Sequence, residues 1–154
     1  MAPLIAIADL EDPQVQELIT FHQRAMLEGS PPGLSFALDL SGLQAEGVTV
    51  WTAHVGPRVA AIGALKRIDR TSGEIKSMRT HPEFLRQGLA AALLEAIITH
   101  ARGLGITRLS LETGTGPAFE PALALYRRRG FANGPAFADY ALTDFNQCLH
   151  LALA

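Results

Sequence analysis

Cysteine and long apolar stretches are what this sequence most lacks. Cys148 is the one cysteine among 154 residues, so the chain can form no internal disulfide framework, and a reducing compartment suits it. No apolar run approaches the roughly 18 residues that a membrane-spanning helix requires. The first residues, MAPLIAIADLEDP, lack the charged start and long apolar core of a signal peptide. We therefore expect a cytoplasmic protein that does not enter a membrane.

An excess of charge of either sign is also missing. The 13 lysines and arginines nearly balance the 15 aspartates and glutamates, which gives a net charge of −2. So small a charge argues against the broad electrostatic attraction by which basic proteins capture nucleic acid. The 5 histidines, at positions 22, 54, 81, 100 and 150, are not spaced like metal ligands, so we expect no metal site.

The sequence does have enough apolar material for a core. Hydrophobic residues make up 48% of the chain, which argues against disorder. No internal repeat or long linker divides the chain, and its length is that of one domain. We therefore expect residues 1–154 to form a single domain.

Strand and helix patterns alternate along the chain. β-forming runs predict strands at Leu4–Ala8, Val48–Val55, Val59–Ile68, Glu74–Thr80 and Thr107–Thr113, and the tail, 136–153, holds two more strand-like runs. Helical periodicity predicts helices at Pro13–Gly29, near Leu40–Leu43, from about Gly88 to Arg102 and from about Phe119 to Arg129. Ser72-Gly73 indicates a turn, and Gly103 and Gly130 are typical of helix C-terminal caps. This order predicts an α/β (α+β) fold with a mixed, mostly antiparallel central sheet and helices on both faces.

One glycine stands where a helix begins. In FLRQGLAAALLEAI, residues 84–97, Gly88 precedes an apolar helical pattern and follows Arg86 and Gln87. A helix N-terminus presents unpaired N–H groups and partial positive charge, and phosphate is a common ligand there. A glycine lets phosphate oxygens approach the backbone, although it can equally serve only to ease the turn into the helix. The motifs of P-loop and dinucleotide-binding proteins are absent, since Gly114-Thr115-Gly116 lacks a third glycine and lies late in the chain.

Two motifs, in order and at the expected separation, resemble a known superfamily. Residues 85–90, LRQGLA, resemble the [QR]-x-x-G-x-[GA] pyrophosphate loop of the GNAT superfamily of N-acetyltransferases. Residues 121–131, PALALYRRRGF, resemble the A-x-x-L-Y-x-x-x-G-F helix of the same superfamily. The segments SPP, ALDL, GEIKSMRT, LSLETG and GPAFADY are similar to a bacterial branch, the YsnE-like acetyltransferases. The resemblance covers nearly the whole chain and implies a GNAT-type sheet.

The resemblance implies a donor and a way to bind it. The donor is acetyl-CoA, used as co-substrate, and its pantetheine arm would lie along the backbone of Met78, Arg79 and Thr80. The pyrophosphate would be held by the loop Leu85, Arg86, Gln87, Gly88, Leu89 and Ala90, with Phe119 and Ala122 also beside the cofactor. The chain departs from the pattern at Leu85, where Gln or Arg is usual, and at Phe119, where many relatives have asparagine. The loss of the donor at position 85 is expected to weaken phosphate binding modestly, unless Arg86 substitutes for it.

The resemblance also implies catalytic residues. Tyr126 matches the tyrosine that protonates the departing thiolate, although a core tyrosine on an amphipathic helix would give the same pattern. Glu74 is the candidate general base for the amine; a period of two places it on the same strand face as Met78, and the alternative is a carboxylate that pairs with Lys76. Glu112 on the next strand is the rival base.

The resemblance implies that the acceptor is a primary amine of a small molecule or a peptide. Asp139 and Tyr140 lie in a segment expected to flank the thioester, where Asp139 would pair with a cationic amine or cap a turn. The alternative function is a module of the same fold that senses acyl-CoA without turnover. A homodimer is compatible with the resemblance because many relatives dimerise.

Overall fold

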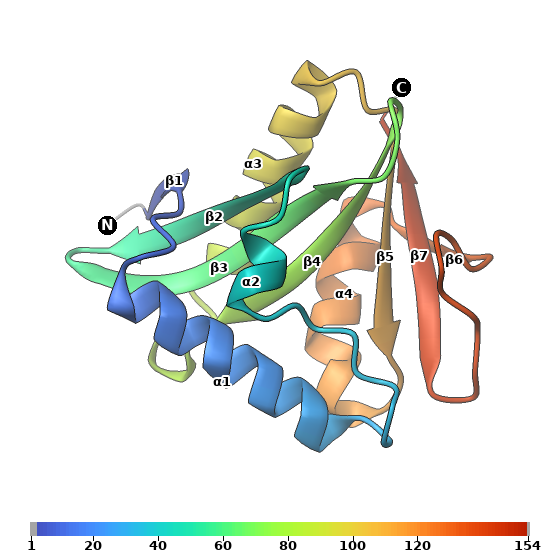
Figure 1. Ribbon diagram of the computed structural model, residues 1–154, viewed down its shortest axis with the longest axis horizontal. Coiled ribbons are helices and arrows are strands. Elements are labelled where there is room, and N and C mark those ends of the chain that lie inside the picture. The colour runs from blue at the N-terminus through green and yellow to red at the C-terminus, as the bar shows by residue number, and fades with distance from the viewer. Residues whose placement is uncertain (1–2, 154) are drawn as a thin grey trace.

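The computed structural model describes residues 3–153, and within them seven strands form one sheet (Figure 1). The strands are β1 (Leu4–Ile7), β2 (Val48–Val55), β3 (Arg58–Arg67), β4 (Ser72–Thr80), β5 (Arg108–Gly114), β6 (Ala132–Gly134) and β7 (Asn146–Ala152). Their order is β1-β2-β3-β4-β5-β7-β6, and among these neighbours β4 and β5 alone run parallel. The expected mixed, mostly antiparallel sheet is therefore confirmed.

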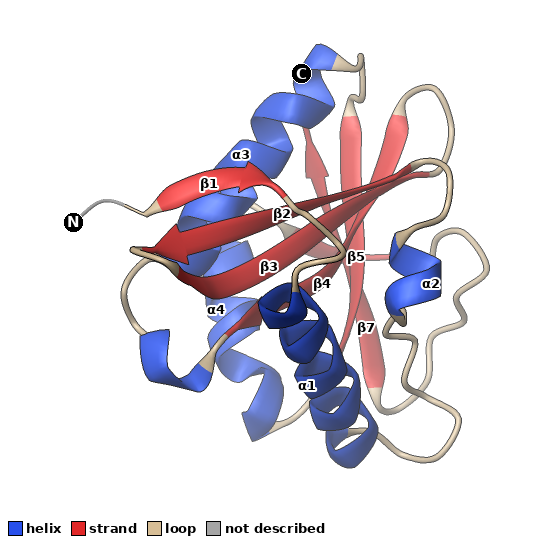
Figure 2. Cartoon of the chain, turned by 60° about the vertical axis from the view of Figure 1, so that its left-hand side comes forward, coloured by secondary structure: helices blue, strands red, loops and turns tan. Residues whose placement is uncertain are grey.

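Helices cover both faces of the sheet. The helices α1 (Pro13–Gly29) and α2 (Leu40–Leu43) lie in front of it in Figure 2, and α3 (Leu89–Gly103) and α4 (Glu120–Arg129) lie behind. Each face has its own cluster of buried apolar residues, the larger one beneath α3 and α4. None of the helices within residues 3–153 is long and apolar enough to span a membrane.

The start of α1 follows directly from the local sequence. Asp12 precedes the helix in an extended conformation, and its side chain accepts a hydrogen bond from the Gln14 amide. Pro13 occupies the first turn, where its missing N–H leaves no bond unmade. The residues Val15, Leu18, Ile19 and His22 are all buried, because their spacing of three and four places them on one helix face.

The sheet opens between β4 and β5. These strands pair only at their starts, where residues 72–74 of β4 pair with residues 108–110 of β5. Beyond that point they diverge, as the lower half of Figure 1 shows. The backbone edges of both strands are left without a strand partner there, and α1 and α4 border the gap. An extended ligand could add to such an edge.

A β-bulge in β4 changes which side chains face which helix layer. Ile62 pairs with Arg79 and Ala64 with Lys76, so Ser77 and Met78 together face the single residue Gly63. Ser77 takes a positive φ of 57°. Because of the extra residue, Met78 turns toward the α3 layer, where a Cβ on Gly63 would meet both Met78 and Ile97.

The expectation that Glu74 and Met78 share a face is therefore wrong. Glu74 instead bonds Lys76 and Tyr140. A strict period of two holds only where the strand is regular, and the bulge between these residues shifts the alternation by one position.

Two expected turn and strand positions are also corrected. Ser72 and Gly73 belong to β4, and the turn before them is formed at Asp69, whose carboxylate accepts the amides of Thr71 and Ser72. The tail 136–153 contains one strand, β7, where two were expected. Its partner β6 lies earlier, at Ala132–Gly134.

The caps at the ends of α3 and α4 differ from each other. Gly130 takes a φ of 110° after α4, as expected of a C-terminal cap. Gly103, by contrast, is the last residue of α3, and the left-handed glycine there is Gly105, with a φ of 81°.

Candidate active site

A cleft of about 250 Å³ occupies the opening between β4 and β5. Four parts of the chain converge on it: the C-terminal half of α1, the bulged part of β4, the middle of β5, and the start of α4 with the turn before it. The lining residues are His22, Ala25, Met26, Gly29, Ile75, Lys76, Ser77, Met78, Arg79, Leu111, Glu112, Thr113, Ala118, Phe119, Ala122 and Tyr126. A smaller hollow of about 50 Å³ adjoins it and adds Glu74, Phe36 and Ala37.

Three residues expected beside the donor line this cleft on the α4 side. Tyr126 is 6% exposed, and burial raises the pKa of its phenol, against a smaller lowering by Arg79. The phenol therefore stays protonated and can donate a hydrogen bond into the cleft. Phe119 packs edge-on against Phe145, with ring centroids 5.5 Å apart, and acts as an apolar wall. Ala122 lines the same cleft, and its small side chain leaves space beside the ring of Phe119.

The start of α3 has the backbone conformation of an anion site. Gly88 is the N-cap of α3 with a φ of 78°, and no side chain caps the helix there. A Cβ added at Gly88 would have no atom within 4 Å among the described residues, apart from its chain neighbours. Arg86 also has a positive φ, of 63°, so two residues with positive φ, Arg86 and Gly88, stand on either side of Gln87 in the turn into α3. Such turns and free helix N-termini gather N–H groups toward an anion.

The side chains of the loop before α3 point away from the core. Leu85 is 55% exposed, and Arg86 and Gln87 are also exposed. Leu89 is buried and anchors the first turn of the helix. An anion placed at this turn would therefore meet backbone groups, and the exposed side chains of Arg86 and Gln87 could add donors.

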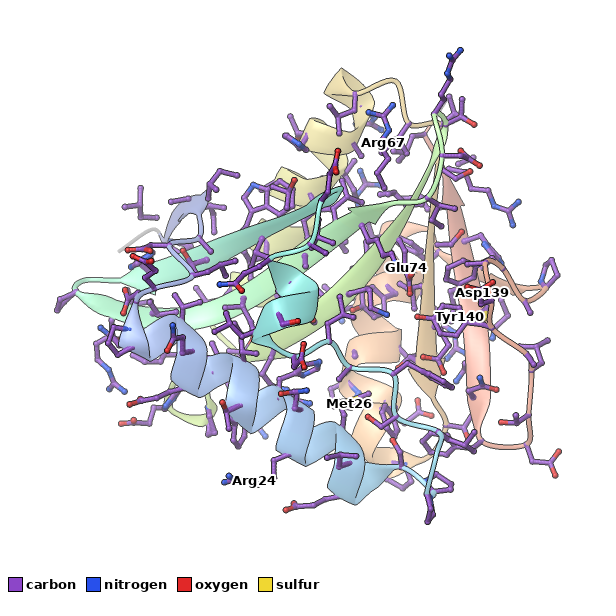
Figure 3. The ribbon with its side chains drawn as sticks, viewed as in Figure 1. Arg24, Met26, Arg67, Glu74, Asp139 and Tyr140 are labelled. Carbon is purple, nitrogen blue, oxygen red and sulfur yellow. The ribbon has the colours of Figure 1, made fainter. Side chains whose placement is uncertain are left out.

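Glu74 lines the smaller hollow and lies beside Tyr140 (Figure 3), and together with Lys76 these residues form a partly buried network. Its carboxylate is 3% exposed and accepts a 2.5 Å hydrogen bond from the Tyr140 hydroxyl. The Lys76 ammonium donates to the Tyr140 oxygen at 2.7 Å and to Glu74 at 3.2 Å. The Tyr140 ring packs on Phe36, at 5.4 Å, and on Phe137, at 5.1 Å. Two loops, before α2 and before β7, therefore meet over Glu74.

Glu112 borders both hollows from the β5 side. Its carboxylate accepts a hydrogen bond from the Asn146 side chain at 3.1 Å. Burial raises the pKa of this carboxyl group, while Asn146 and Lys76 oppose the shift. A carboxylate with a raised pKa is a stronger base, and pKa shifts of this kind are frequent at catalytic sites.

Sequence reasoning missed three polar features of β4 and α1. Ser77 is 8% exposed, and its hydroxyl oxygen is buried without a hydrogen-bond partner among residues 3–153. Arg79 donates through Nε to Nδ1 of His22 at 2.9 Å. Burial, and secondarily Arg79, lowers the pKa of His22 to about 3, so the imidazole is neutral. No motif marked these side chains, because the bulge that turns Ser77 and the helix that carries His22 meet only in the folded chain.

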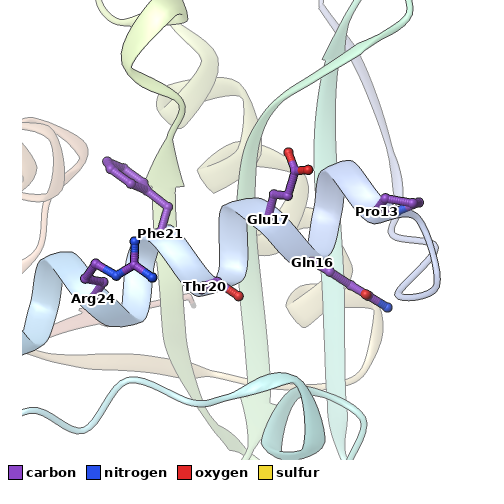
Figure 4. A pocket seen from close by; sticks show the side chains of 6 residues that line it. All are labelled: Pro13, Gln16, Glu17, Thr20, Phe21 and Arg24. Carbon is purple, nitrogen blue, oxygen red and sulfur yellow. The ribbon is translucent and has the colours of Figure 1, made fainter.

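Two other candidates lie apart from the cleft. Asp139 is exposed and does not line either hollow, whereas its neighbour Tyr140 reaches Glu74. A larger, open hollow of about 440 Å³ runs along the outer side of α1, shown in Figure 4. Its lining comes from that one helix: Pro13, Gln16, Glu17, Thr20, Phe21 and Arg24. No group from a second element converges on it, so it has less of the character of a catalytic site than the cleft.

Within residues 3–153, no group of three or more His, Cys, Asp or Glu side chains could hold a metal ion. The cleft itself offers a protonated phenol, the Glu112 carboxylate and the cations of Lys76 and Arg79, and Glu74 borders the adjoining hollow. Together with the open strand edge and the glycine turn that begins α3, these groups suit transfer of an acyl group from a phosphate-bearing carrier.

Known proteins share the sequence family and the fold. The model of the acetyltransferase (GNAT) family matches residues 15–131. YedL of Escherichia coli (strain K12), an uncharacterized N-acetyltransferase, is 45% identical over 94% of this chain and 91% of its own length. YsnE of Bacillus subtilis (strain 168), described in the same words, is 46% identical over 88% of this chain and 90% of its own. The structure of yncA from Salmonella typhimurium with its cofactor acetyl-CoA matches 100% of this chain and 95% of yncA, with a TM-score of 0.76 and 19% identity. The resemblance found in residues 85–90 and 121–131 is thus confirmed.

Proposed function

This chain belongs to the GNAT family of acetyltransferases, and we propose that it moves the acetyl group of acetyl-CoA to the primary amine of a small acceptor in the cytoplasm. The observation that carries the proposal is the cleft between β4 and β5, which joins an open strand edge to Tyr126 at one side and Glu112 at the other. The anion site at the start of α3 supports phosphate binding at one end of the same strand.

Acetyl-CoA would be held mostly by backbone. We propose that the N–H groups from Leu85 to Ala90 bind its pyrophosphate and that the edge of β4 at Met78, Arg79 and Thr80 binds its pantetheine arm. The open space at Gly88 and the unpartnered edge of β4 fit such a ligand. Bound there, the thioester supplies an acetyl group that an amine can accept.

The reaction joins the amine nitrogen to the acetyl carbon and breaks the carbon–sulfur bond. An acceptor that arrives as an ammonium ion gives up two protons, the leaving thiolate takes one, and one is released to solvent. We propose that Tyr126 donates the proton to sulfur, since burial keeps its phenol protonated. A backbone N–H at the bulge of β4 would stabilise the developing oxyanion.

One of two carboxylates would accept the proton from the amine. Glu74 was the first choice from the sequence, but its Oε2 already accepts from both Tyr140 and Lys76. Glu112 lines the larger cleft directly and has a raised pKa, which favours it as the base. Glu74 would then fix Tyr140 and Lys76 at the acceptor side of the site.

A ligand-binding test with a matched pair of glycine variants checks the proposal. Gly88 and Gly105 stand at opposite ends of α3, have φ values of 78° and 81°, and both have open space at the Cβ position. Gly88→Trp and Gly105→Trp therefore carry a similar backbone strain, but only the first blocks the anion site. A ligand at 100 times its Kd adds roughly 2.7 kcal/mol to stability.

We expect acetyl-CoA and CoA, but not NAD or ATP, to raise the melting temperature of the wild type and of Gly105→Trp, and not of Gly88→Trp. Thiol release from acetyl-CoA with a panel of primary amines then measures turnover. Stabilisation without thiol release would favour a non-catalytic acyl-CoA sensor. A shift retained in Gly88→Trp would contradict the cofactor site.

A further inference from the structure

Arg79 carries a half-buried charge that the protein itself does not neutralise. Its guanidinium lines the cleft, and no carboxylate oxygen within residues 3–153 lies within 4.0 Å of it. Its hydrogen bond goes to His22, which accepts it as a neutral imidazole and so adds no negative charge. Phe21 offers only a ring face, with the guanidinium carbon 5.6 Å from the ring centre. Because buried charges in proteins are normally paired, an anion from outside the chain is expected at this position.

Ser77 adds a second donor two residues away on the same strand. Its hydroxyl is buried and has no partner in the described part of the chain, yet Ser77 lines both hollows. An unsatisfied buried hydroxyl costs stability unless a ligand completes it. Its positive φ adds backbone strain, and strained residues of this kind are frequent at functional sites.

The anion is not expected to come from acetyl-CoA. The phosphates of that molecule belong at the start of α3 in the proposed binding mode, and its pantetheine arm is uncharged. Arg79 bonds His22 and therefore points to the α1 side of the sheet, opposite the layer of α3 and α4. The remaining ligand is the acceptor, whose amine must approach Glu112 in the same cleft.

We propose that the acceptor is a free amino acid or a similar small zwitterion, whose carboxylate binds the Arg79 guanidinium and the Ser77 hydroxyl while its amine faces Glu112. This inference rests on the proposed function and names its substrate class. A guanidinium is the side chain best suited to a carboxylate, because it can donate two parallel hydrogen bonds. A small acceptor fits the size of the site, because the cleft has a volume of about 250 Å³ and the adjoining hollow, beside which Phe36 packs on Tyr140, about 50 Å³.

Arg79→Gln and Arg24→Gln form a matched test. Both substitutions remove one positive charge, but Arg24 lies on the outer side of α1 (Figure 4) and does not line the cleft. The acceptors are the common L- and D-amino acids, each compared with its carboxamide, in which the amine is kept and the carboxylate is lost. Thiol release gives kcat and KM, and calorimetry on the CoA-loaded protein measures acceptor binding without turnover.

For the best amino acid, Arg79→Gln should lower kcat/KM by about 10- to 100-fold, mainly through KM, as expected for a lost charge-assisted hydrogen bond. It should also abolish the preference over the carboxamide, with the Kd of acetyl-CoA unchanged within about twofold. Arg24→Gln should leave all these values unchanged. Arg79→Lys keeps the positive charge but loses the two parallel N–H donors of the guanidinium, so it should recover part of the loss in kcat/KM. Ser77→Ala should cost about 2- to 10-fold, the range of a neutral hydrogen bond.

The outcomes separate the inference from the function on which it rests. Acetylation of amines with no preference for a carboxylate, or an equal loss of acetyl-CoA affinity in Arg79→Gln, overturns the inference and leaves the enzyme. Binding of amino acids that depends on Arg79 without thiol release supports the carboxylate site and overturns the enzyme. Neither turnover nor carboxylate-dependent binding overturns both. Melting temperatures of all variants show that each is folded.

Discussion

His22 predicts a specific loss of stability in acid. The side chain is 6% exposed, and burial lowers its pKa to about 3 in the folded protein, from an ordinary value of 6.5. Between these two values the unfolded chain binds a proton at His22 and the folded chain does not. Stability therefore rises with pH across this range and is lost as the pH falls below 6.5.

The magnitude follows from the width of the interval. A pH of 5.0 lies 1.5 units below the ordinary pKa of the imidazole in the unfolded chain. Each unit corresponds to about 1.4 kcal/mol of stability. His22 alone should therefore remove about 2 kcal/mol between pH 7.5 and pH 5.0. That amount is a large fraction of a typical stability of 5–15 kcal/mol.

Urea unfolding at the two pH values measures this loss. The single tryptophan, Trp51, is 5% exposed and reports unfolding through its fluorescence. The test variant is His22→Asn, because the amide oxygen of asparagine can replace Nδ1 as the acceptor for Arg79. The control is Thr20→Asn on the exposed face of the same helix.

The wild type and Thr20→Asn should lose about 2 kcal/mol more than His22→Asn when the pH falls from 7.5 to 5.0. Glu112 works in the opposite direction, since its raised pKa makes the folded chain bind the proton more readily, but it is present in all three proteins. An equal acid loss in wild type and His22→Asn would refute the reasoning and show that the imidazole is not held neutral by burial.

Three further predictions concern the chemistry of the candidate site. Tyr126→Phe should lower kcat by about 10²- to 10⁴-fold, the usual contribution of a general acid, and leave the Kd of acetyl-CoA nearly unchanged; an equal loss in both would remove Tyr126 from the proton transfer. Glu112→Gln should abolish the acidic limb of the pH profile of kcat/KM, because the group with the raised pKa is gone. Glu74→Gln should keep that limb and instead raise the KM of the acceptor, and loss of the limb in Glu74→Gln alone would return the role of base to Glu74.

Local patterns were sufficient for much of the fold. The apolar spacing in α1 and α3 predicted both helices, since one buried face at 3.6 residues per turn is visible in the sequence itself. Gly88 was likewise recognised beforehand at the start of α3, and its positive φ gives a conformational reason for the glycine. The C-terminal part was less well predicted: β6 lies before the tail in which a second strand was expected, and a strand as short as β6 carries little periodic signal.

The candidate site also combines residues that local motifs indicated with contacts that only the folded chain brings together. Tyr126 and the loop 85–90 were proposed from short motifs, because each motif consists of residues that are contiguous in the chain. The contact of Tyr140 with Glu74 joins residues 66 positions apart, and that of Arg79 with His22 joins residues 57 apart. No local pattern encodes such pairs, since they depend on how two loops and a helix pack on the sheet.

The sequence by itself determined the order of α1 to α4 and of β1 to β5, the family and the place of the glycine that begins α3, because each depends on residues close together in the chain. Only the tertiary structure decided which face each side chain of β4 presents. The bulge at Ser77 and Met78 opposite Gly63 sets that choice, and it arises from the register between two strands. By turning Ser77 and Arg79 into the cleft, this one extra residue converts an ordinary strand edge into a polar site.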